Sequence, residues 1–301
     1  MANSPVITSL PAYVEENRLP LISKAVLGAK TPSLLTLQTG VKGDTALNLL
    51  QTSVVFGDGA DCGWNEAGTS TLTQRIIKPV IAKVNMAFCD KKLIGKWAQS
   101  QVRIAAGLEK LPFEEEFLNS VNDGIKAGIE KMVWQGDSAN GESRVECDGF
   151  LKLLGADSSV IDVTLTSGAS VYQNTLKVLN AIPGEVYDRA SIFMGCDYFR
   201  SLVQDLVAAD LYHYNVEGGD AMEIVLPGTN IKVYGVHGLD GTKKIVAGPR
   251  DEMFYGVDFE NDEEVFDLFY SKDNREFRLA VEFVCGVQYA FGDHMVLGAE
   301  A

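Results

Sequence analysis

The run FGDGADCGWNEAG at residues 56–68 contains the residue types of a metal-binding loop. Carboxylate and amide oxygens on a glycine-rich loop are the ligands that hard cations take in proteins. A calcium loop needs oxygen ligands at alternate positions, a central glycine and a closing glutamate. Counted from Asp58, the positions for three of these ligands hold Ala60, Cys62 and Thr69, so the spacing does not fit. We interpret the run as a solvated turn without a metal ion.

Histidine and cysteine supply no second metal candidate. A histidine site would need all three histidines to converge, and ordinary surface or core roles are their default; they are His213, His237 and His294. The five cysteines are far apart and form no C-x-x-C pair, which favours buried thiols over structural zinc. They are Cys62, Cys89, Cys147, Cys196 and Cys285. We therefore predict no metal and no cofactor.

The chain also lacks the motifs of common catalytic sites. It contains no G-x-S-x-G nucleophile elbow and no G-x-x-x-x-G-K-S/T phosphate loop. The segment GLDGTKK at residues 238–244 has the wrong spacing for a phosphate loop. Cys62 is a thiol in a turn that we expect to be exposed, but no motif supplies a base to activate it. We predict no catalytic residue.

The composition is that of a folded and strongly acidic protein. Hydrophobic residues make up 46% of the 301 residues, which suffices for the core of one large domain or two ordinary ones. The net charge of −15 argues against a surface that grips nucleic acid, which should be basic. It is compatible with an acidic shell that faces packaged DNA, or with plain solubility. Because no apolar run reaches about eighteen residues and no secretory signal is present, we expect no membrane contact.

Two segments of the chain are predicted to need a neighbour. Residues 1–35 have weak periodicity and several prolines, which indicates an extended arm with helical pieces that a partner surface orders. Residues 36–90 have the pattern of a long β-hairpin, in which LNLLQTSVVF leads to the glycine-rich run and TLTQRIIKPVIAKVNMAF returns. Such a long hairpin cannot bury both its faces alone, so we expect it to lie against something else.

The clearest predicted helix spans residues 113–134. It carries one apolar stripe at four-residue spacing, formed by Phe117, Val121, Ile125 and Ile129. Pro112 suits the start of this helix and Gly136 suits its end. At 1.5 Å per residue its length would be about 33 Å, which makes it a spine for the fold.

The second half of the chain combines predicted helices and strands. They alternate from residue 160 onward, and the last segment is the cleanest strand of all. In EFRLAVEFVCGVQYAFG every odd position from Phe277 to Phe291 is apolar, which indicates one buried and one wet face. EEVFDLFYS is its expected antiparallel partner across the turn at residues 272–274. The predicted fold class is α+β, with the stripe of the spine helix packed on this strand.

The order of these elements resembles the Hong Kong 97-like fold of tailed-phage major capsid proteins, which encapsulin shells share. The similarity is strongest at residues 61–97, which resemble the hairpin-return segment of capsid proteins from crAss-like and related phages of gut Bacteroidetes. The shared motifs are Cys62-Gly63-Trp64, Gly68 to Thr71, Thr73-Gln74-Arg75 and Lys83-Val84-Asn85. The segment RASIFMGCDYFRSL at residues 189–202 is also similar to the axial domain of that family.

The resemblance implies a division of the chain and a function. It assigns residues 1–35 to an N-terminal arm, 36–90 to an extended hairpin called the E-loop, 91–160 with 245–301 to a peripheral domain that contains the spine helix, and 161–244 to an axial domain. The implied function is a major capsid protein of a tailed double-stranded DNA phage. Such a structural protein, which is not an enzyme, self-assembles in the host cytoplasm into hexamers and pentamers of an icosahedral virion shell.

The resemblance also implies partners. These are other copies of the chain, packaged double-stranded DNA on the inner face without sequence-specific contacts, and portal, scaffold or decoration proteins. Many relatives carry a long N-terminal scaffolding segment that this chain lacks, so we expect a cleaved segment or a separate scaffold. Some relatives join a hairpin lysine to an asparagine of a neighbouring subunit. Lys42 and Lys78 lie in the hairpin, but no asparagine partner is identified, so this chemistry is not carried over.

In this interpretation the opening run is the tip of an arm that reaches onto the next subunit. Trp64 offers a flat apolar anchor, and the acidic residues keep the tip soluble before assembly. The residues expected at this intersubunit contact are Asp58, Asp61, Trp64, Asn65 and Glu66. The alternative is an idle solvent turn with a half-buried tryptophan.

Two other functions stay open at this point. An encapsulin-like compartment would have the same fold and would show an apolar groove for a cargo peptide on its inner surface. An enzyme with an α/β site that has no recognisable motif would carry that site in residues 160–250.

Overall fold

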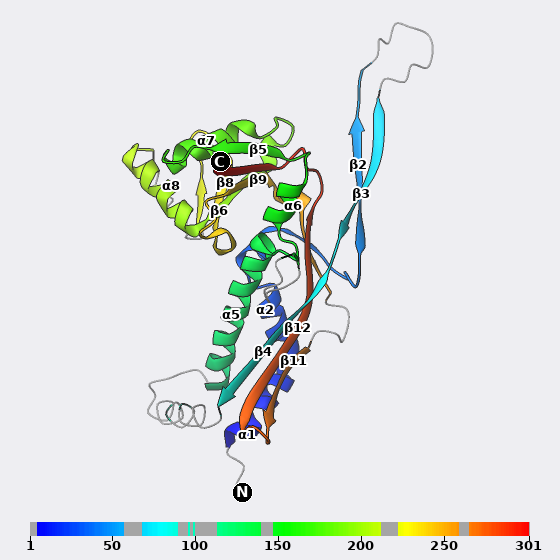
Figure 1. The fold of residues 1–301 in the computed structure, drawn as a ribbon, viewed down its shortest axis with the longest axis vertical. Helices are drawn as coiled ribbons and strands as arrows, with labels where there is room; N and C mark the ends of the chain where they lie inside the picture. The colour runs from blue at the N-terminus through cyan, green and yellow to red at the C-terminus, as the bar shows by residue number, and fades with distance from the viewer. Residues whose placement is uncertain are drawn as a thin grey trace.

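The computed structural model describes residues 5–56, 68–89, 113–139, 147–211, 222–258 and 265–300, together with the single positions 96 and 99. They form three parts: a long sheet backed by helices, a second sheet with helices of its own, and a two-stranded hairpin that projects away from both (Figure 1). This mixture agrees with the α+β class that the sequence predicts.

The long sheet is built around β12 (Glu276–Tyr289). β11 (Val265–Ser271) and β4 (Val80–Cys89) pair antiparallel with its N-terminal part. β10 (Met253–Val257) pairs antiparallel with its C-terminal residues, and β1 (Thr36–Gln38) pairs parallel with β10. β11 is the partner of β12 that the sequence predicts, because the two strands are joined across the turn at residues 272–274.

The alternation in β12 produces the buried face that the sequence predicts. Every odd position from Phe277 to Tyr289 is at most 5% exposed. The even positions that carry Arg278, Glu282 and Gln288 are partly exposed, because successive side chains of a strand point to opposite faces. One face of the sheet is therefore apolar and needs a covering layer.

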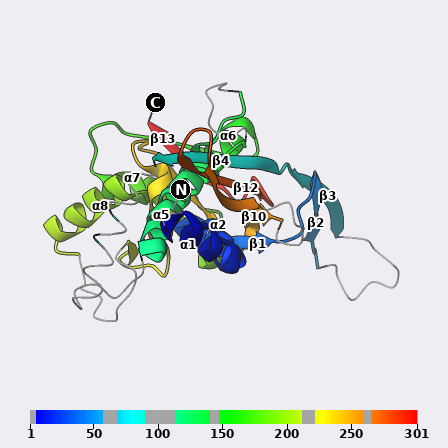
Figure 2. The same ribbon diagram turned by 90° about the horizontal axis from the view of Figure 1, so that it is seen from below.

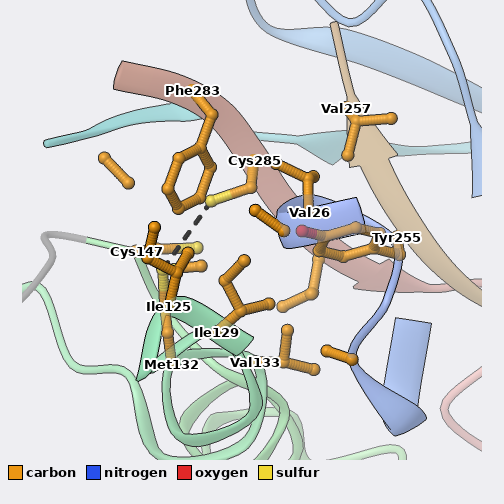
Figure 3. Packing of buried hydrophobic residues seen from close by; sticks show 14 of the residues in the cluster. Val26, Ile125, Ile129, Met132, Val133, Cys147, Tyr255, Val257, Phe283 and Cys285 are labelled. Carbon is orange, nitrogen blue, oxygen red and sulfur yellow. Dashed lines mark hydrogen bonds between the residues drawn. The ribbon is translucent and has the colours of Figure 1, made fainter. Parts of the chain in front are cut away.

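Helix α5 (Phe113–Gln135) is part of that layer. Val121, Ile125 and Ile129 are buried at 7%, 5% and 1% exposure, and Phe117 is partly buried against the same core. Figure 3 shows Ile125 and Ile129 beside residues of β12 and β10. The Cys285 thiol of β12 lies 3.7 Å from the Met132 sulfur of α5, so the helix and strand are in direct contact. Among the helices that the structure describes, none is long and apolar enough to cross a membrane.

The N-terminal segment has the helical pieces that the sequence suggested, but it packs on its own chain and is not an extended arm. It forms α1 (Pro5–Glu16), α2 (Arg18–Val26) and α3 (Lys30–Leu34), and α1 and α2 lie side by side beneath the sheet in Figure 2. Leu10 and Val14 of α1 are buried in the same core as the spine helix. Apolar residues at helical spacing on these helices cover sheet surface that α5 leaves open, so the segment packs within its own chain.

The second sheet has six strands in the order β5-β13-β9-β6-β8-β7. Its outer strands, β5 (Ile161–Leu165) and β7 (Glu223–Val225), are partly exposed, whereas all residues of the inner strand β6 (Ala190–Gly195) are buried. β13 pairs parallel with β5, and β8 pairs parallel with β6. The remaining elements of this part are β8 (Lys232–Val236), β9 (Ile245–Pro249), β13 (Val296–Glu300), α7 (Val171–Ala181), α8 (Cys196–Ala208) and the short 3-10 turns η1 (Tyr187–Arg189), η2 (His237–Leu239) and η3 (Arg250–Glu252).

Two strands of this sheet lie outside the range that the resemblance assigned to it. The sequence analysis placed residues 245–301 with the peripheral part, yet β9 and β13 occupy inner positions of the six-stranded sheet. β9 is wholly buried between β6 and β13. Short apolar strands carry no mark of which sheet they join, because that choice depends on chain path and not on their pattern.

The projecting hairpin consists of β2 (Thr45–Ser53) and β3 (Thr69–Ile77), which pair antiparallel along their full lengths. The sequence suggested one return strand through residue 88, but the chain divides at Lys78-Pro79 and continues as β4 in the long sheet. Proline has no backbone N–H to donate to a ladder, so a strand readily ends beside it. Helix α6 (Phe150–Ala156) packs against α5 and β12.

Candidate functional site

The hairpin has one face toward the rest of the subunit and one face toward solvent. At its base Leu47 and Leu49 are buried together with Ile77. On the opposite face Leu50 and Leu72 lie directly across from each other and are 64% and 68% exposed. A two-stranded ribbon has no second layer of its own, so this outward face has nothing to cover it within the described chain.

The described end of the hairpin is apolar as well. Val54, Val55 and Phe56 follow β2, and the Phe56 side chain is 95% exposed. Contiguous exposed apolar residues on a soluble protein mark interaction surfaces more often than chance exposure does. The sequence analysis did not single these residues out. The run VVF next to the glycine-rich turn could have indicated them, because three consecutive apolar residues do not fit the alternation of a half-buried strand.

The base of the hairpin is seated on two glycines. Gly256 of β10 and Gly286 of β12 are paired across the sheet, and Ile77 lies over both. A Cβ on Gly256 or Gly286 would lie 3.2 Å or 3.0 Å from the Ile77 Cγ2 atom, closer than ordinary contact. The two missing side chains therefore create the depression into which the fully buried Ile77 fits.

A polar cluster stands beside this apolar seat. The Arg75 Nη2 atom of β3 lies 2.6 Å from Asp157 Oδ2, just beyond α6. The Arg75 guanidinium also stacks 4.4 Å above the ring centre of Tyr289 at the end of β12. The Tyr289 hydroxyl donates to the same Asp157 oxygen at 2.9 Å. Ser159 donates to the other oxygen, Oδ1, from its N–H at 2.9 Å and its hydroxyl at 2.7 Å.

These contacts keep the cluster in one protonation state. Burial alone would raise the pKa of the Asp157 carboxyl, but hydrogen bonds from Ser159, Arg75 and Tyr289 outweigh it and hold the pKa well below its usual range. Burial and the bond to Asp157 raise the pKa of Tyr289 to about 12. Burial would lower the pKa of Arg75, but the hydrogen bond to Asp157 outweighs it. At neutral pH the arginine and aspartate are charged and the tyrosine is protonated.

Above this cluster the hairpin separates from the subunit. A cleft of about 560 Å³ lies between residues such as Gln51 and Thr71 and the body residues Arg189, Glu252 and His294. The nearly buried Glu252 carboxylate lies 2.7 Å from both the Arg189 Nη2 and His294 Nδ1 atoms. Both carboxylate oxygens already have basic partners, so Glu252 is not a free general base.

The predicted site residues fall into two groups. The five tip residues Asp58, Asp61, Trp64, Asn65 and Glu66 lie outside the described residues. The four stripe residues Phe117, Val121, Ile125 and Ile129 all belong to α5 and its core. The residues that shape the hairpin base, above all Arg75, Asp157 and Tyr289, were missed. They are far apart in the sequence, and although Arg75 belongs to the motif Thr73-Gln74-Arg75, nothing in the sequence links it to Asp157 or Tyr289.

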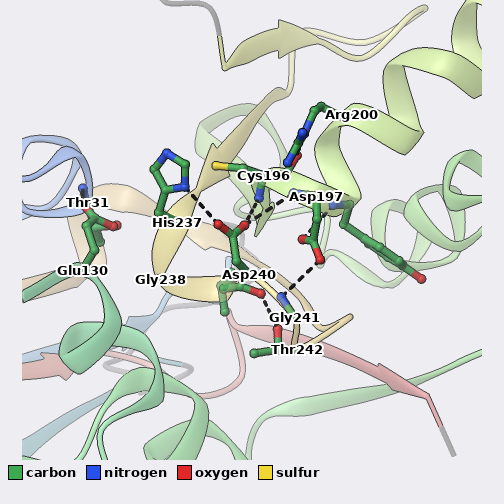
Figure 4. Close-up of polar contacts among 12 residues, drawn as sticks. Thr31, Glu130, Cys196, Asp197, Arg200, His237, Gly238, Asp240, Gly241 and Thr242 are labelled. Atoms are coloured by element: carbon green, nitrogen blue, oxygen red, sulfur yellow. Dashed lines mark hydrogen bonds and ion pairs between the residues drawn. The ribbon is translucent and has the colours of Figure 1, made fainter. Parts of the chain in front are cut away.

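One group among the described residues has metal-ligand types close together. Possible ligand atoms of Cys196, His237 and Asp240 lie within 4.8 Å of one another (Figure 4). Asp240 Oδ1, however, accepts the N–H groups of Cys196 and Asp197 at 2.5 and 3.4 Å, and Oδ2 lies 2.9 Å from His237 Nδ1. Burial raises the pKa of the Cys196 thiol to about 11, so it is protonated at neutral pH. The group is explained as a cap on the N-terminus of α8.

Comparison with known proteins gives likenesses in structure. No protein-family model and no curated protein sequence matches the chain. The satellite phage P4 procapsid that includes the size determination (Sid) protein is 9% identical, with a TM-score of 0.61 over 94% of this chain and 99% of that chain. Gordonia phage Cozz is 12% identical, with a TM-score of 0.57 over 90% and 86%. The virus-like particle from Pyrococcus furiosus is 8% identical, with a TM-score of 0.55 over 95% and 98%.

The class that these likenesses define is a fold. The chain has the Hong Kong 97-like fold over about nine-tenths of its length, as the sequence resemblance implies. The projecting hairpin, the spine helix and the two sheets are parts of this one arrangement. At identities of 8 to 12% the likeness concerns the fold, and the function has to be argued from the chain's own surface.

Proposed function

We propose that this chain is the major capsid protein of a tailed double-stranded DNA phage, which self-assembles into hexamers and pentamers of an icosahedral shell. The observation that carries the proposal is the hairpin formed by β2 and β3. Its outward apolar face, with Leu50 and Leu72, is uncovered, and so is Phe56 at its described end. A second copy of the chain is the partner that such an arm fits, because the solved structures of the same fold include a procapsid and a virus-like particle.

The division of the subunit follows from the same proposal. The helix-backed long sheet serves as the peripheral domain, with residues 91–160 and most of 245–301, and residues 161–244 form the axial domain together with β9 and β13. The hairpin within residues 36–90 is the E-loop. Residues 1–35 are the N-terminal arm, whose helices support the spine in their own subunit. The apolar stripe on α5 would hold the helix on the long sheet when the hairpin binds a neighbouring copy.

The tip of the hairpin is proposed to be its anchoring end. Trp64 would dock on a neighbouring subunit beside Asn65, and the carboxylates of Asp58, Asp61 and Glu66 would keep the free tip soluble. The exposed run that ends at Phe56 supports this assignment, because it leads into the tip and continues the apolar surface toward it. Aromatic residues are the most frequent anchors in protein interfaces.

Further partners are proposed from charge and resemblance. The net charge of −15 is compatible with an inner face that meets packaged DNA without sequence-specific contacts, and the resemblance supports a virion assembled with portal, scaffold or decoration proteins. Among tailed phages, we place the chain nearest to those of crAss-like and related Bacteroidetes phages. The motifs Cys62-Gly63-Trp64, Gly68 to Thr71, Thr73-Gln74-Arg75 and Lys83-Val84-Asn85 support that placement.

A shell that encloses protein cargo is the second candidate. It is favoured by the likeness to the Pyrococcus furiosus virus-like particle over nearly the whole of both chains. Such a shell would need an apolar groove for a cargo peptide on its inner face. Two clefts among the described residues are lined mainly by polar and charged side chains, so neither of them is such a groove.

Electron microscopy and sedimentation of the purified full chain test the proposal. We expect closed particles of uniform size, assembled alone or with co-expressed phage scaffold, that sediment far faster than the 32.7 kDa subunit. Absorbance at 260 and 280 nm after nuclease treatment separates the two candidates, because a phage shell isolated from infected cells protects DNA. A chain that remains monomeric under all these conditions would contradict both candidates.

A further inference from the structure

The contacts between the hairpin and its own subunit are concentrated at the base. Ile77, Leu47 and Leu49 are buried there, whereas β2 and β3 residues farther out, from Leu50 and Thr73 to the described end, are all exposed. Farther out, the Gln51 Nε2 atom lies 3.5 Å from Asp293 Oδ2, which is at the limit for a hydrogen bond. A long arm held only at its base can swing unless something at the base resists rotation.

The Ile77 seat by itself is a pivot. One apolar side chain in a depression formed by Gly256 and Gly286 fixes a point on the hairpin but no direction, since apolar contact is not directional. The backbone on both sides offers short connections, through Gly40, which has φ +73°, before β2 and through Lys78-Pro79 after β3. Leu47 and Leu49 are buried beside it, and the Gln288 side-chain amide donates to the Ile76 carbonyl at 3.0 Å; a further contact held in both position and plane would resist rotation.

Arg75 provides that contact. It lies two residues from Ile77 on the same face of β3, and its planar guanidinium is held by Asp157 on one side and by the Tyr289 ring below. An arginine between a carboxylate and an aromatic ring is constrained in both position and plane. The two contacts therefore oppose rotation of the hairpin about Ile77.

The receiving side of this contact is built independently of the hairpin. Asp157 accepts from Ser159 and from the Tyr289 hydroxyl, and Tyr289 also donates to the Leu153 carbonyl at 3.3 Å. All of these groups belong to α6, the segment after it and β12, so Arg75 is the one member of the cluster that the hairpin contributes. Loss of Arg75 leaves Asp157 with three hydrogen bonds and Tyr289 in place.

We propose that Arg75, Asp157 and Tyr289 form a latch that fixes the angle of the hairpin in the unassembled subunit. A latched hairpin presents Leu50, Leu72 and Phe56 in one direction, so a neighbouring copy binds a preformed surface and loses less conformational entropy on association. This consequence for assembly rests on the proposed function. The latch itself is a property of the single chain.

Spin-label distance measurements on the unassembled full chain test the latch. Labels are attached to the native exposed Cys89 on β4 and to Ser70→Cys on the hairpin, in a Cys62→Ser background. The remaining cysteines, Cys147, Cys196 and Cys285, are buried. We expect one narrow distance distribution with Arg75 present and a distribution at least twice as wide in Arg75→Gln. An unchanged width in a folded Arg75→Gln protein would overturn the proposal.

Two further variants control the measurement. Arg250→Gln removes an arginine that also stacks on a tyrosine, at 5.2 Å from the Tyr234 ring, but that does not belong to the hairpin; it should leave the width unchanged. Arg75→Lys keeps the charge and loses the planar stack, and should give an intermediate width even if Arg75→Gln folds poorly. Narrow distributions in both Arg75 variants with normal particle assembly would contradict the latch but not the proposed function. Broadened distributions in a chain that never assembles would support the latch and contradict the proposed function.

Discussion

Glu130 shows how single residues tie the N-terminal segment to the spine. This buried carboxylate of α5 accepts the Thr31 N–H through Oε1 at 2.5 Å and the Thr31 hydroxyl through Oε2 at 2.6 Å. The Trp134 indole N–H donates to the same hydroxyl at 2.8 Å. The Thr31 N–H belongs to the first turn of α3, where helix donors have no partner of their own. Glu130 therefore satisfies α3 and costs little to bury.

The stripe on α5 leads to a stability prediction. Ile125→Ala should lower the free energy of unfolding by about 2–5 kcal/mol, because it opens a cavity between α5 and β12 in a core that cannot collapse freely. Ile125 is 5% exposed and faces Phe283 and Cys285 in Figure 3. Urea unfolding of the unassembled subunit measures the change. Val207→Ala on α8, where the side chain is 54% exposed, is the control and should shift the value by less than about 0.5 kcal/mol.

Asp157 leads to a prediction on pH. Its pKa is lower in the folded chain than in the unfolded chain, so its contribution to stability is complete above the ordinary carboxyl range and is lost as pH falls below about 4. Asp157→Asn should therefore destabilise the chain by about 1–3 kcal/mol at pH 7, where it leaves Arg75 without its charged acceptor.

The same comparison at acidic pH checks the sign. The difference in unfolding free energy between wild type and Asp157→Asn should shrink as pH is lowered from 5 toward 2, in urea titrations at each pH. A difference that stays constant across this range would mean that the Asp157 pKa is not shifted by folding.

At the scale of elements, the outward face of the hairpin is an exposed apolar surface that a partner could cover. Docking Leu50 and Leu72 on a neighbour would remove apolar area worth up to about 2 kcal/mol each, at about 25 cal/mol per Å². The double variant Leu50→Ser, Leu72→Ser should keep the melting temperature of the subunit, because both side chains are already exposed. It should raise the concentration needed for assembly at least tenfold, which takes about 1.4 kcal/mol per subunit.

Light scattering against subunit concentration measures that threshold. Val207→Ser, which changes an apolar residue on α8 that is also more than half exposed, is the control and should assemble as wild type does. A double variant that assembles at the wild-type concentration would show that this face of the hairpin remains in solvent within the particle. A double variant with a lowered melting temperature would show that the face is packed inside its own subunit.

At the scale of the whole molecule, the described chain consists of two buried cores and one projecting hairpin. The larger core joins α5, the N-terminal helices and the long sheet, and the other core lies within the six-stranded sheet and its helices. Trp134 and Phe193 connect the two parts with ring centres 5.4 Å apart, and η2 packs against α5. The two parts are thus packed against each other, and the hairpin projects from them (Figure 1). In the proposed shell, the uncovered face of the hairpin would gain its contacts from neighbouring copies of the chain.

The sequence alone determined the elements whose pattern is local. The alternation from Phe277 onward predicted β12 and its buried face, and the four-residue spacing through Ile129 predicted α5, because period two and period 3.6 are written in adjacent residues. The order of elements and the shared motifs pointed to the Hong Kong 97-like fold, which the structure has.

Only the tertiary structure decided which elements meet. It sent β4 to the long sheet at Lys78-Pro79, and β9 and β13 to the six-stranded sheet. It turned residues 5–34 into helices that cover their own subunit. It also brought Arg75 to Asp157 and Tyr289, across 82 residues to Asp157. Such pairings are set by the three-dimensional path of the chain, because the type of a residue does not show which distant residue it will contact.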